Sequence, residues 1–376
     1  MDIYECGEKL KALRIGDMVA KIPIIQGGMG VGISRSKLAG AVAAEGGIGI
    51  ISTAQIGYDE DGFEKDQAGC NLLAIRKHIK RAKEIACGNG LVGVNIMVAL
   101  KHYKEHVMEA VAAGADVIIS GAGLPVKLPE YIGKAKTKIA PIVSSRRAAD
   151  IILKMWARRY DRTADFVVIE GPKAGGHLGF SDEELADIDI IECTKEYGEK
   201  YNTHIPVIVA GGIFDHDDII HALELGADGV QIASRFVTTK ECDASDEYKQ
   251  AYLDAKEDDV KIIKSPVGMP GRAIRNDFIK RVEKEKQPVD KCYNCMKKCN
   301  PNEVPYCITK ALVDAVNGDI NNGLIFCGAN VGRINEMTTV HELMKELVQP
   351  TDKKIQDENE THDIQNVYSQ RDKMIS

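Results

Sequence analysis

The chain has 376 residues, of which 44% are hydrophobic and 28% charged, and its formal net charge is −7 at pH 7. This composition is typical of a globular protein with one large or two smaller domains, and the acidic balance without a basic, aromatic-interleaved stripe argues against nucleic-acid binding. No apolar run approaches the roughly 20 residues needed to span a membrane, and no secretory leader pattern begins the chain. We therefore expect a cytoplasmic protein whose partners are small molecules.

Strand-like apolar segments alternate with helix-like segments through the first 236 residues. Runs rich in β-branched residues occur at 22–26, 48–53, 91–98, 116–121, 138–143, 165–170, 205–210 and 229–234. The intervening helical patterns often end in glycine, which is typical of a helix C-terminus. Eight such units with nearly continuous apolar strands predict a (β/α)8 barrel over residues 1–236. A doubly wound sheet is the alternative, but the segment after the first strand, QGGMGVGIS, lacks the GxGxxG fingerprint.

The pattern changes after the eighth strand. Residues 237–349 are more polar and contain a group of cysteines, which indicates a lid or extension packed on the barrel. Residues 350–376 are rich in charge and amides, and we expect a flexible tail there.

The decapeptide EGPKAGGHLG, residues 170–179, is the most informative segment. It follows the sixth predicted strand, beginning with Glu170 and carrying Gly175 and Gly176 directly before His177. Glycines let the backbone approach a ligand closely, and the carboxyl ends of barrel strands hold active sites. His177 is therefore the candidate catalytic residue, although a surface loop with an inert histidine would have the same composition.

Other candidate ligand-binding residues follow neighbouring strands. Backbone N–H groups of Gly211, Gly212, Ser234 and Arg235, after the seventh and eighth strands, are placed where barrels bind phosphate. The alternative is that the two glycines only permit a tight turn. Further candidates at strand ends are Gln26, Gly28, Met29, Asn95 and Ser144.

Six segments together resemble a known family. PIIQGGMG, GVNIM, EGPKAGGHLG, IPVIVAGGI, VQIASRF and GMPGRAIRN are similar to the FMN-dependent family of nitronate monooxygenases (2-nitropropane dioxygenases) and flavin enoyl-ACP reductases II, over roughly residues 20–280. The resemblance implies a TIM barrel with noncovalent FMN, His177 as base or hydrogen-bonding catalyst, and Met29, Asn95 and Glu170 near the flavin. Many relatives read GTRF where this chain reads ASRF (233–236).

Three functions remain open from the sequence. The resemblance implies first the oxidation of nitronates or nitroalkanes, and second an NAD(P)H-dependent reduction of enoyl thioesters by the same constellation. A flavin redox sensor, in which the cysteine segment signals, is a third hypothesis. A homodimer is compatible with each of these.

The cysteines of this group are spaced like the ligands of a metal site. Cys292, Cys295, Cys299 and Cys307 read C-x2-C-x3-C-x7-C, and thiolates so spaced are able to surround one metal or cluster. The arrangement is similar to the iron–sulfur segment of the 2,4-dienoyl-CoA reductases. A [4Fe–4S] cluster, a structural zinc and metal-free thiols on a lid are the three alternatives.

Overall fold

The computed structural model describes residues 10–179 and 187–350, and its centre is a closed parallel barrel. The strand order around the barrel is β10-β11-β3-β4-β5-β6-β7-β8. Their bounds are β3 Ile24–Gln26, β4 Ile48–Ser52, β5 Leu91–Met97, β6 Val117–Gly121, β7 Lys138–Val143, β8 Val167–Glu170, β10 Val207–Ala210 and β11 Gly229–Ile232. Every predicted strand coincides with one of these, so the (β/α)8 prediction is confirmed.

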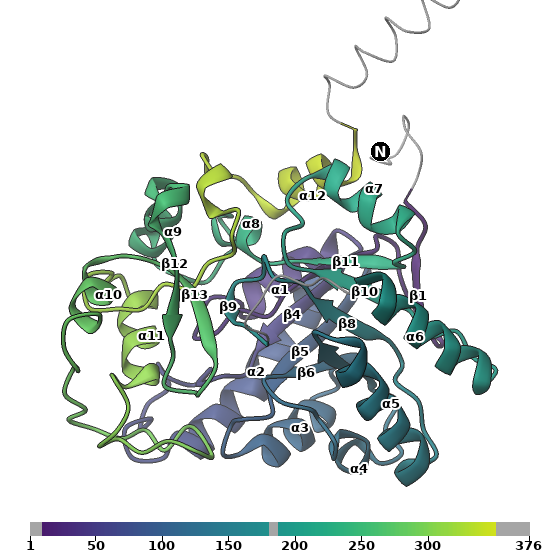
Figure 1. Ribbon diagram of the computed structural model, residues 1–376, viewed down its shortest axis with the longest axis horizontal. Helices are drawn as coiled ribbons and strands as arrows, with labels where there is room; N and C mark the ends of the chain where they lie inside the picture. The colour runs from purple at the N-terminus through teal and green to yellow at the C-terminus, as the bar shows by residue number, and fades with distance from the viewer. Residues whose placement is uncertain (1–9, 180–186, 351–376) are drawn as a thin grey trace, which may run out of the picture.

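Helices cover the outside of the barrel (Figure 1). They are α1 Ser36–Ala44, α2 Gln67–Ala86, α3 Tyr103–Ala112, α4 Leu128–Ile132, α5 Arg146–Tyr160, α6 Asp187–Lys200, α7 His216–Glu224 and α8 Ser234–Val237. Asp215 caps the start of α7, because its side chain accepts the N–H of Asp218 at 3.1 Å. None of the helices in the two described ranges is long and apolar enough to cross a membrane.

The inside of the barrel is a packed core rather than a pore. Fully buried branched residues such as Ile25, Ile50 and Val168 point inward and fill it. Two short strands, β1 Leu13–Ile15 and β2 Met18–Ala20, form an antiparallel hairpin whose Leu13 and Ile15 join this inner cluster. One end of the barrel is therefore sealed by apolar packing.

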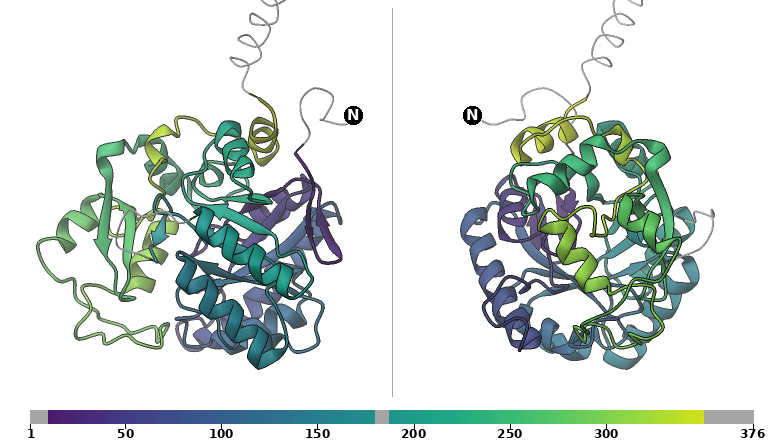
Figure 2. Two further views of the ribbon diagram at one scale, coloured as in Figure 1. Left: turned by 45° about the vertical axis from the view of Figure 1, so that its right-hand side comes forward. Right: turned by 90° about the vertical axis from the view of Figure 1, so that its left-hand side faces the viewer.

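A separate group of elements lies over the other end of the barrel, at the left of Figure 1 and facing the viewer in the right panel of Figure 2. It contains a three-stranded antiparallel sheet and the short helices around it, which together we call the lid. The lid elements are β9 Gly176–His177, α9 Asp246–Asp254, η1 Glu257–Asp259, β12 Val260–Lys264, β13 Pro270–Ile274, α10 Asp277–Val282, α11 Ile308–Val316 and η2 Val331–Arg333.

The lid has its own small core, and the chain then returns to the barrel. Phe278, Tyr306 and Leu324 belong to a buried cluster distinct from those of the barrel. After it, α12 Val340–Val348 packs on α1, α7 and α8. Within the predicted extension 237–349, the last helix thus completes the helical layer of the barrel. The predicted tail lies outside the described residues, apart from residue 350.

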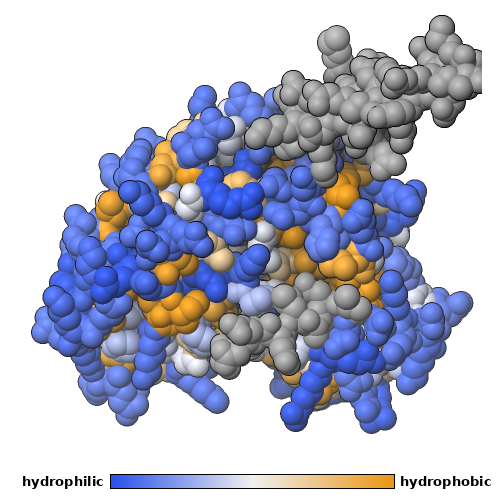
Figure 3. Space-filling view, turned by 45° about the horizontal axis from the view of Figure 1, so that its top comes forward, coloured by the Kyte–Doolittle hydropathy of each residue, from blue (hydrophilic) through white to orange (hydrophobic). Residues whose placement is uncertain are grey.

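The face of the molecule in Figure 3 is mostly hydrophilic, with small, separate apolar patches. Exposed large apolar residues such as Leu73, Met108 and Ile262 lie on different elements. Scattered exposed apolar residues of this kind are normal on protein surfaces.

Candidate active site

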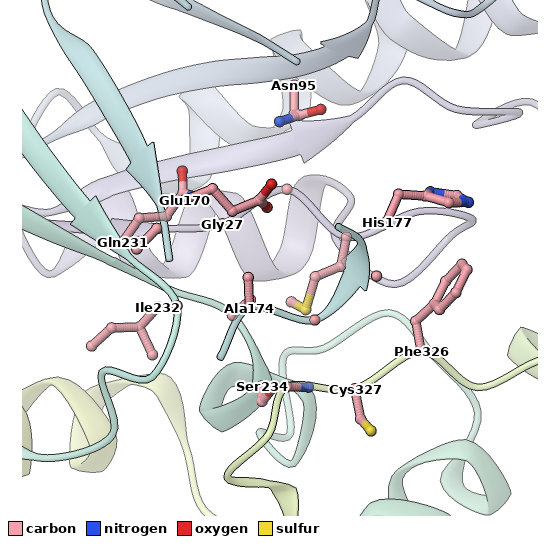
Figure 4. Close-up of a pocket in the computed structure, with 18 of the residues that line it drawn as sticks. Gly27, Asn95, Glu170, Ala174, His177, Gln231, Ile232, Ser234, Phe326 and Cys327 are labelled. Atoms are coloured by element: carbon pink, nitrogen blue, oxygen red, sulfur yellow. Dashed lines mark hydrogen bonds between the residues drawn. The ribbon is translucent and has the colours of Figure 1, made fainter. Parts of the chain in front are cut away.

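A cavity of about 240 Å³ lies between the carboxyl ends of the barrel strands and the lid. Side chains from several strand ends border it, among them Asn95 of β5, Glu170 of β8 and Gln231 of β11. Figure 4 shows these side chains around one space, with His177 and Phe326 to one side of it. In a barrel of this kind the strand ends are the usual place for chemistry.

His177 is held by the lid rather than by the barrel. The backbone of His177 pairs antiparallel with Gly271 of β13. The short strand β9 is therefore the edge strand of the lid sheet. Its Nε2 lies 2.8 Å from Oγ of the buried Ser265, and its ring meets Phe326 edge-on with a centroid distance of 4.9 Å. Burial lowers the pKa of His177 to about 4, so the imidazole is neutral near pH 7.

Two hydrogen-bond acceptors that line the cavity have no donor among the described residues. The Oε1 atom of Gln231 is buried without a hydrogen-bond partner, and the carboxyl of Glu170 makes no hydrogen bond to the described part of the chain. Burial raises the pKa of Glu170 to about 7. Buried polar atoms normally find partners, so both groups indicate a ligand with O–H or N–H donors.

The unpaired Glu170 gives the protein a testable pH dependence. The carboxyl has its ordinary pKa of 4.5 when unfolded and one of about 7 when folded, so stability falls as pH rises between these values. We expect Glu170→Gln to stabilise the flavin-free protein at pH 8, by at most about 3 kcal/mol, and to have little effect at pH 5. Thermal unfolding at both pH values measures this, with the exposed Glu224→Gln as control. A stabilisation equal at both pH values would contradict it.

Glycines form a turn in which a side chain has no room. Gly211 and Gly212 have φ of +93° and +101°, and a Cβ on Gly211 would lie 2.8 Å from the carbonyl oxygen of Gly171. Their N–H groups make no hydrogen bond within the described residues. The N–H groups of Ser234 and Arg235, in the first turn of α8, are also free of helical partners. This cradle is suited to an anionic group such as a phosphate.

A segment that the sequence did not single out closes the cavity. Residues 326–330, which we call the strap, run from Phe326 to Asn330. The strap is fastened by Gly328 N–H to Ser234 Oγ at 3.0 Å and by Asn330 Nδ2 to Gly212 O at 2.8 Å. A Cβ on Gly175 would lie 2.6 Å from the backbone of Cys327, so only glycine allows this contact. In the sequence, the only indication of the strap is the segment CGAN at residues 327–330, where a glycine follows the cysteine.

The structure gathers most of the predicted ligand-binding residues at this cavity but not all. Those that line it are Gly28, Met29, Asn95, Glu170, Gly175, Gly176, His177, Gly211, Gly212, Ser234 and Arg235. Gln26 does not line it, because its side chain is fully buried and accepts the N–H of Ile50. Ser144 lies beside Gly179 instead. The guanidinium of Arg235 pairs with Glu346 at 2.7 Å, so only its backbone serves the cradle.

The prediction of a metal at the cysteine group is not supported. Within the described residues, no three histidine, cysteine or acidic side chains are arranged to hold an ion, and this includes Cys292, Cys295, Cys299 and Cys307. Cys292 is exposed. The backbone of Cys295 is attached to the barrel, because its carbonyl accepts the N–H of Lys101. Asn294, between these two, has a left-handed φ of +50°, which turns the chain there.

Comparison with known proteins identifies the family. The family model described as nitronate monooxygenase matches residues 12–350. The chain belongs to this family. It is accordingly an oxidoreductase, and the cavity described above lies within the matched region.

Individual relatives of the family differ in their reactions. A probable nitronate monooxygenase of Bacillus subtilis is 25% identical over 87% of this chain and 95% of its own. A Mycobacterium tuberculosis protein named as a carboxyl-CoA dehydrogenase of a methyl-oxo-octahydroindene is 28% identical, over 69% of this chain and 65% of its own. The solved structure of FabK from Thermotoga maritima has 26% identity and a TM-score of 0.70, over 90% of this chain and 96% of its own.

Proposed function

We propose that this protein binds FMN in the cavity and oxidises alkyl nitronates. The single observation that carries the proposal is the neutral imidazole of His177 at a cavity that has a phosphate-type cradle and two acceptors, on Glu170 and Gln231, without partners among the described residues. The residues fit FMN: the amides of Gly211, Gly212, Ser234 and Arg235 would hold the phosphate, and Glu170 and Gln231 would accept from hydroxyl or ring N–H groups. FMN, when bound, supplies the electron transfer to oxygen.

His177 favours an anionic substrate. Because its folded pKa is about 4, the imidazole is a weak base at neutral pH but still offers an N–H donor. A nitronate has already lost its proton and needs only a donor to its oxygens, whereas a neutral nitroalkane must lose a proton first. Ser265 holds Nε2, which leaves Nδ1 without a partner in the described residues. We therefore expect nitronates to react faster than the parent nitroalkanes.

One observation supports a second candidate, an NAD(P)H-dependent reduction of enoyl thioesters. FabK is 26% identical with a TM-score of 0.70, and the mycobacterial relative is named for a CoA thioester. In that reaction His177 would donate or order the proton at the carbon next to the thioester. A redox sensor is less well supported, because the cavity between barrel and lid is not filled by the lid.

Purification followed by two assays tests the proposal. We expect bound FMN with its absorption near 370 and 450 nm, and release of nitrite with oxygen uptake when propyl-2-nitronate is added. NAD(P)H oxidation with crotonyl-CoA, under anaerobic conditions, measures the second candidate. A protein that binds no FMN would overturn the cofactor assignment. FMN with thioester reduction but no nitrite would replace the first function by the second.

A further inference from the structure

A second cavity of about 200 Å³ lies beside the first and is outside the machinery described so far. It is bordered by the first turn of α2, the start of α3 and the cysteine segment of the lid, with Gln67, His106 and Cys295 among its lining residues. Consecutive residues divide the two cavities, since Ala54 lines the first and Gln55 the second. A molecule at one is therefore close to the other.

A buried histidine presents an acceptor to this cavity. His106 is only 3% exposed, and its Nδ1 lies 3.2 Å from Oγ1 of Thr53. The Thr53 hydroxyl also lies 3.3 Å from the carbonyl oxygen of Asn95, to which it can donate, and this pairing favours the tautomer in which Nδ1 of His106 donates to Thr53. In that tautomer the lone pair of His106 is on Nε2, which has no partner in the described part of the chain. Burial lowers the pKa of His106 to about 4, which keeps the ring neutral.

The other lining groups fit a flat, polar ring with a phosphate attached. Gln67 and Asn294 carry carboxamides that both donate and accept, and Leu100 and Tyr293 provide apolar and aromatic surface. Two charged side chains also line the cavity: the exposed Lys65, which would face the phosphate, and Asp66, whose carboxylate accepts the N–H of Gly69 at 2.9 Å. Adenine has an exocyclic amine that would donate to Nε2 of His106, and ring nitrogens that would accept from the amides.

We propose that this second cavity binds the adenine nucleotide end of a co-substrate whose reacting end enters the flavin cavity. Nicotinamide dinucleotides and coenzyme A thioesters share this chemistry. The inference rests on the proposed function in that the first cavity holds FMN, and on its second candidate reaction, which is the one that uses such co-substrates. Binding at the second cavity needs no turnover to be measured.

Calorimetric titration of the FMN-loaded protein with AMP tests the proposal. We expect saturable binding, and His106→Leu is expected to raise the dissociation constant about fivefold or more, because the adenine amine loses its acceptor. His106→Gln keeps an acceptor and should bind AMP within about twofold of the parent. Ala68→Met, which fills the cavity from α2, should weaken AMP at least about tenfold. Lys80→Met, an exposed change on the same helix, should leave it unchanged.

FMN content and the thermal midpoint show whether each variant is folded, and ribose 5-phosphate separates base from phosphate recognition. Displacement of AMP by NADPH identifies a dinucleotide site, and displacement by coenzyme A identifies a thioester site; either supports the proposal. Binding of AMP no tighter than ribose 5-phosphate, an unchanged affinity in both His106→Leu and Ala68→Met, or displacement by neither co-substrate would overturn it. Intact nitronate oxidation in such a case would leave the proposed function standing.

Discussion

Replacing His177 with glutamine is expected to leave FMN bound and to reduce the oxidation of a neutral nitroalkane by about 10²–10⁴-fold. The imidazole lies at the cavity and contacts Ser265 and Phe326 but no strand of the barrel, so its loss should not disturb the phosphate cradle. Oxidation of the corresponding nitronate should fall less, since no proton has to be removed from carbon. The measurement is nitrite release from 2-nitropropane and from propyl-2-nitronate.

The contrast between the two substrates is the informative result. An exposed histidine, His204→Gln, serves as the matched control and should change neither rate. Equal losses on both substrates would mean that His177 acts mainly as a donor to the nitro group. No loss on either substrate would remove His177 from the mechanism, whatever the state of the flavin.

Replacing Gly211 with alanine is expected to weaken FMN binding at least about tenfold. A Cβ there would lie 2.8 Å from Gly171 O and 3.0 Å from Ala174 N, in backbone that already needs a φ of +93°. The neighbouring loop would have to move, and with it the amides that face the phosphate. The measurement is the dissociation constant of FMN, from fluorescence titration of the flavin-free protein.

The expected effect has two possible causes, the clash of the added Cβ and the strain of a side chain at positive φ. A glycine that has the positive φ but open surroundings separates them. Gly88 has a φ of +75° and nothing within 4 Å of the position of a Cβ. Gly88→Ala should therefore destabilise the fold by about 1 kcal/mol without changing FMN affinity. If both variants bind FMN like the parent, the turn after β10 is not the phosphate site.

The barrel, and many of the residues at the carboxyl ends of its strands, could be predicted from local sequence patterns. The apolar runs ending at Gln26, Glu170 and Ala210 are long enough to be strands, and the glycines that follow them are typical of turns that expose the backbone. Parallel strands in a barrel all present their carboxyl ends on one face. Residues far apart in sequence, such as Asn95 and Ser234, were thus expected at one cavity, and the structure places both there.

Contacts between the barrel and the lid could not be predicted in this way. Ser265 and Phe326 reach His177, and Asn330 reaches Gly212, across separations that no periodicity encodes. The cysteine spacing suggested a metal because thiols near in sequence are often near in space. In the part of the chain that the structure describes, however, they are not arranged to hold an ion.

The sequence by itself therefore determined the fold, the resemblance to the family and the end of the barrel at which the candidate site lies, because strand length and glycine placement are local properties. Only the tertiary structure decided which groups are paired. It leaves the acceptors of Glu170, Gln231 and His106 without protein partners, and it fixes His177 through Ser265. Pairing depends on the packing of segments distant in sequence, and burial then sets the pKa of each group.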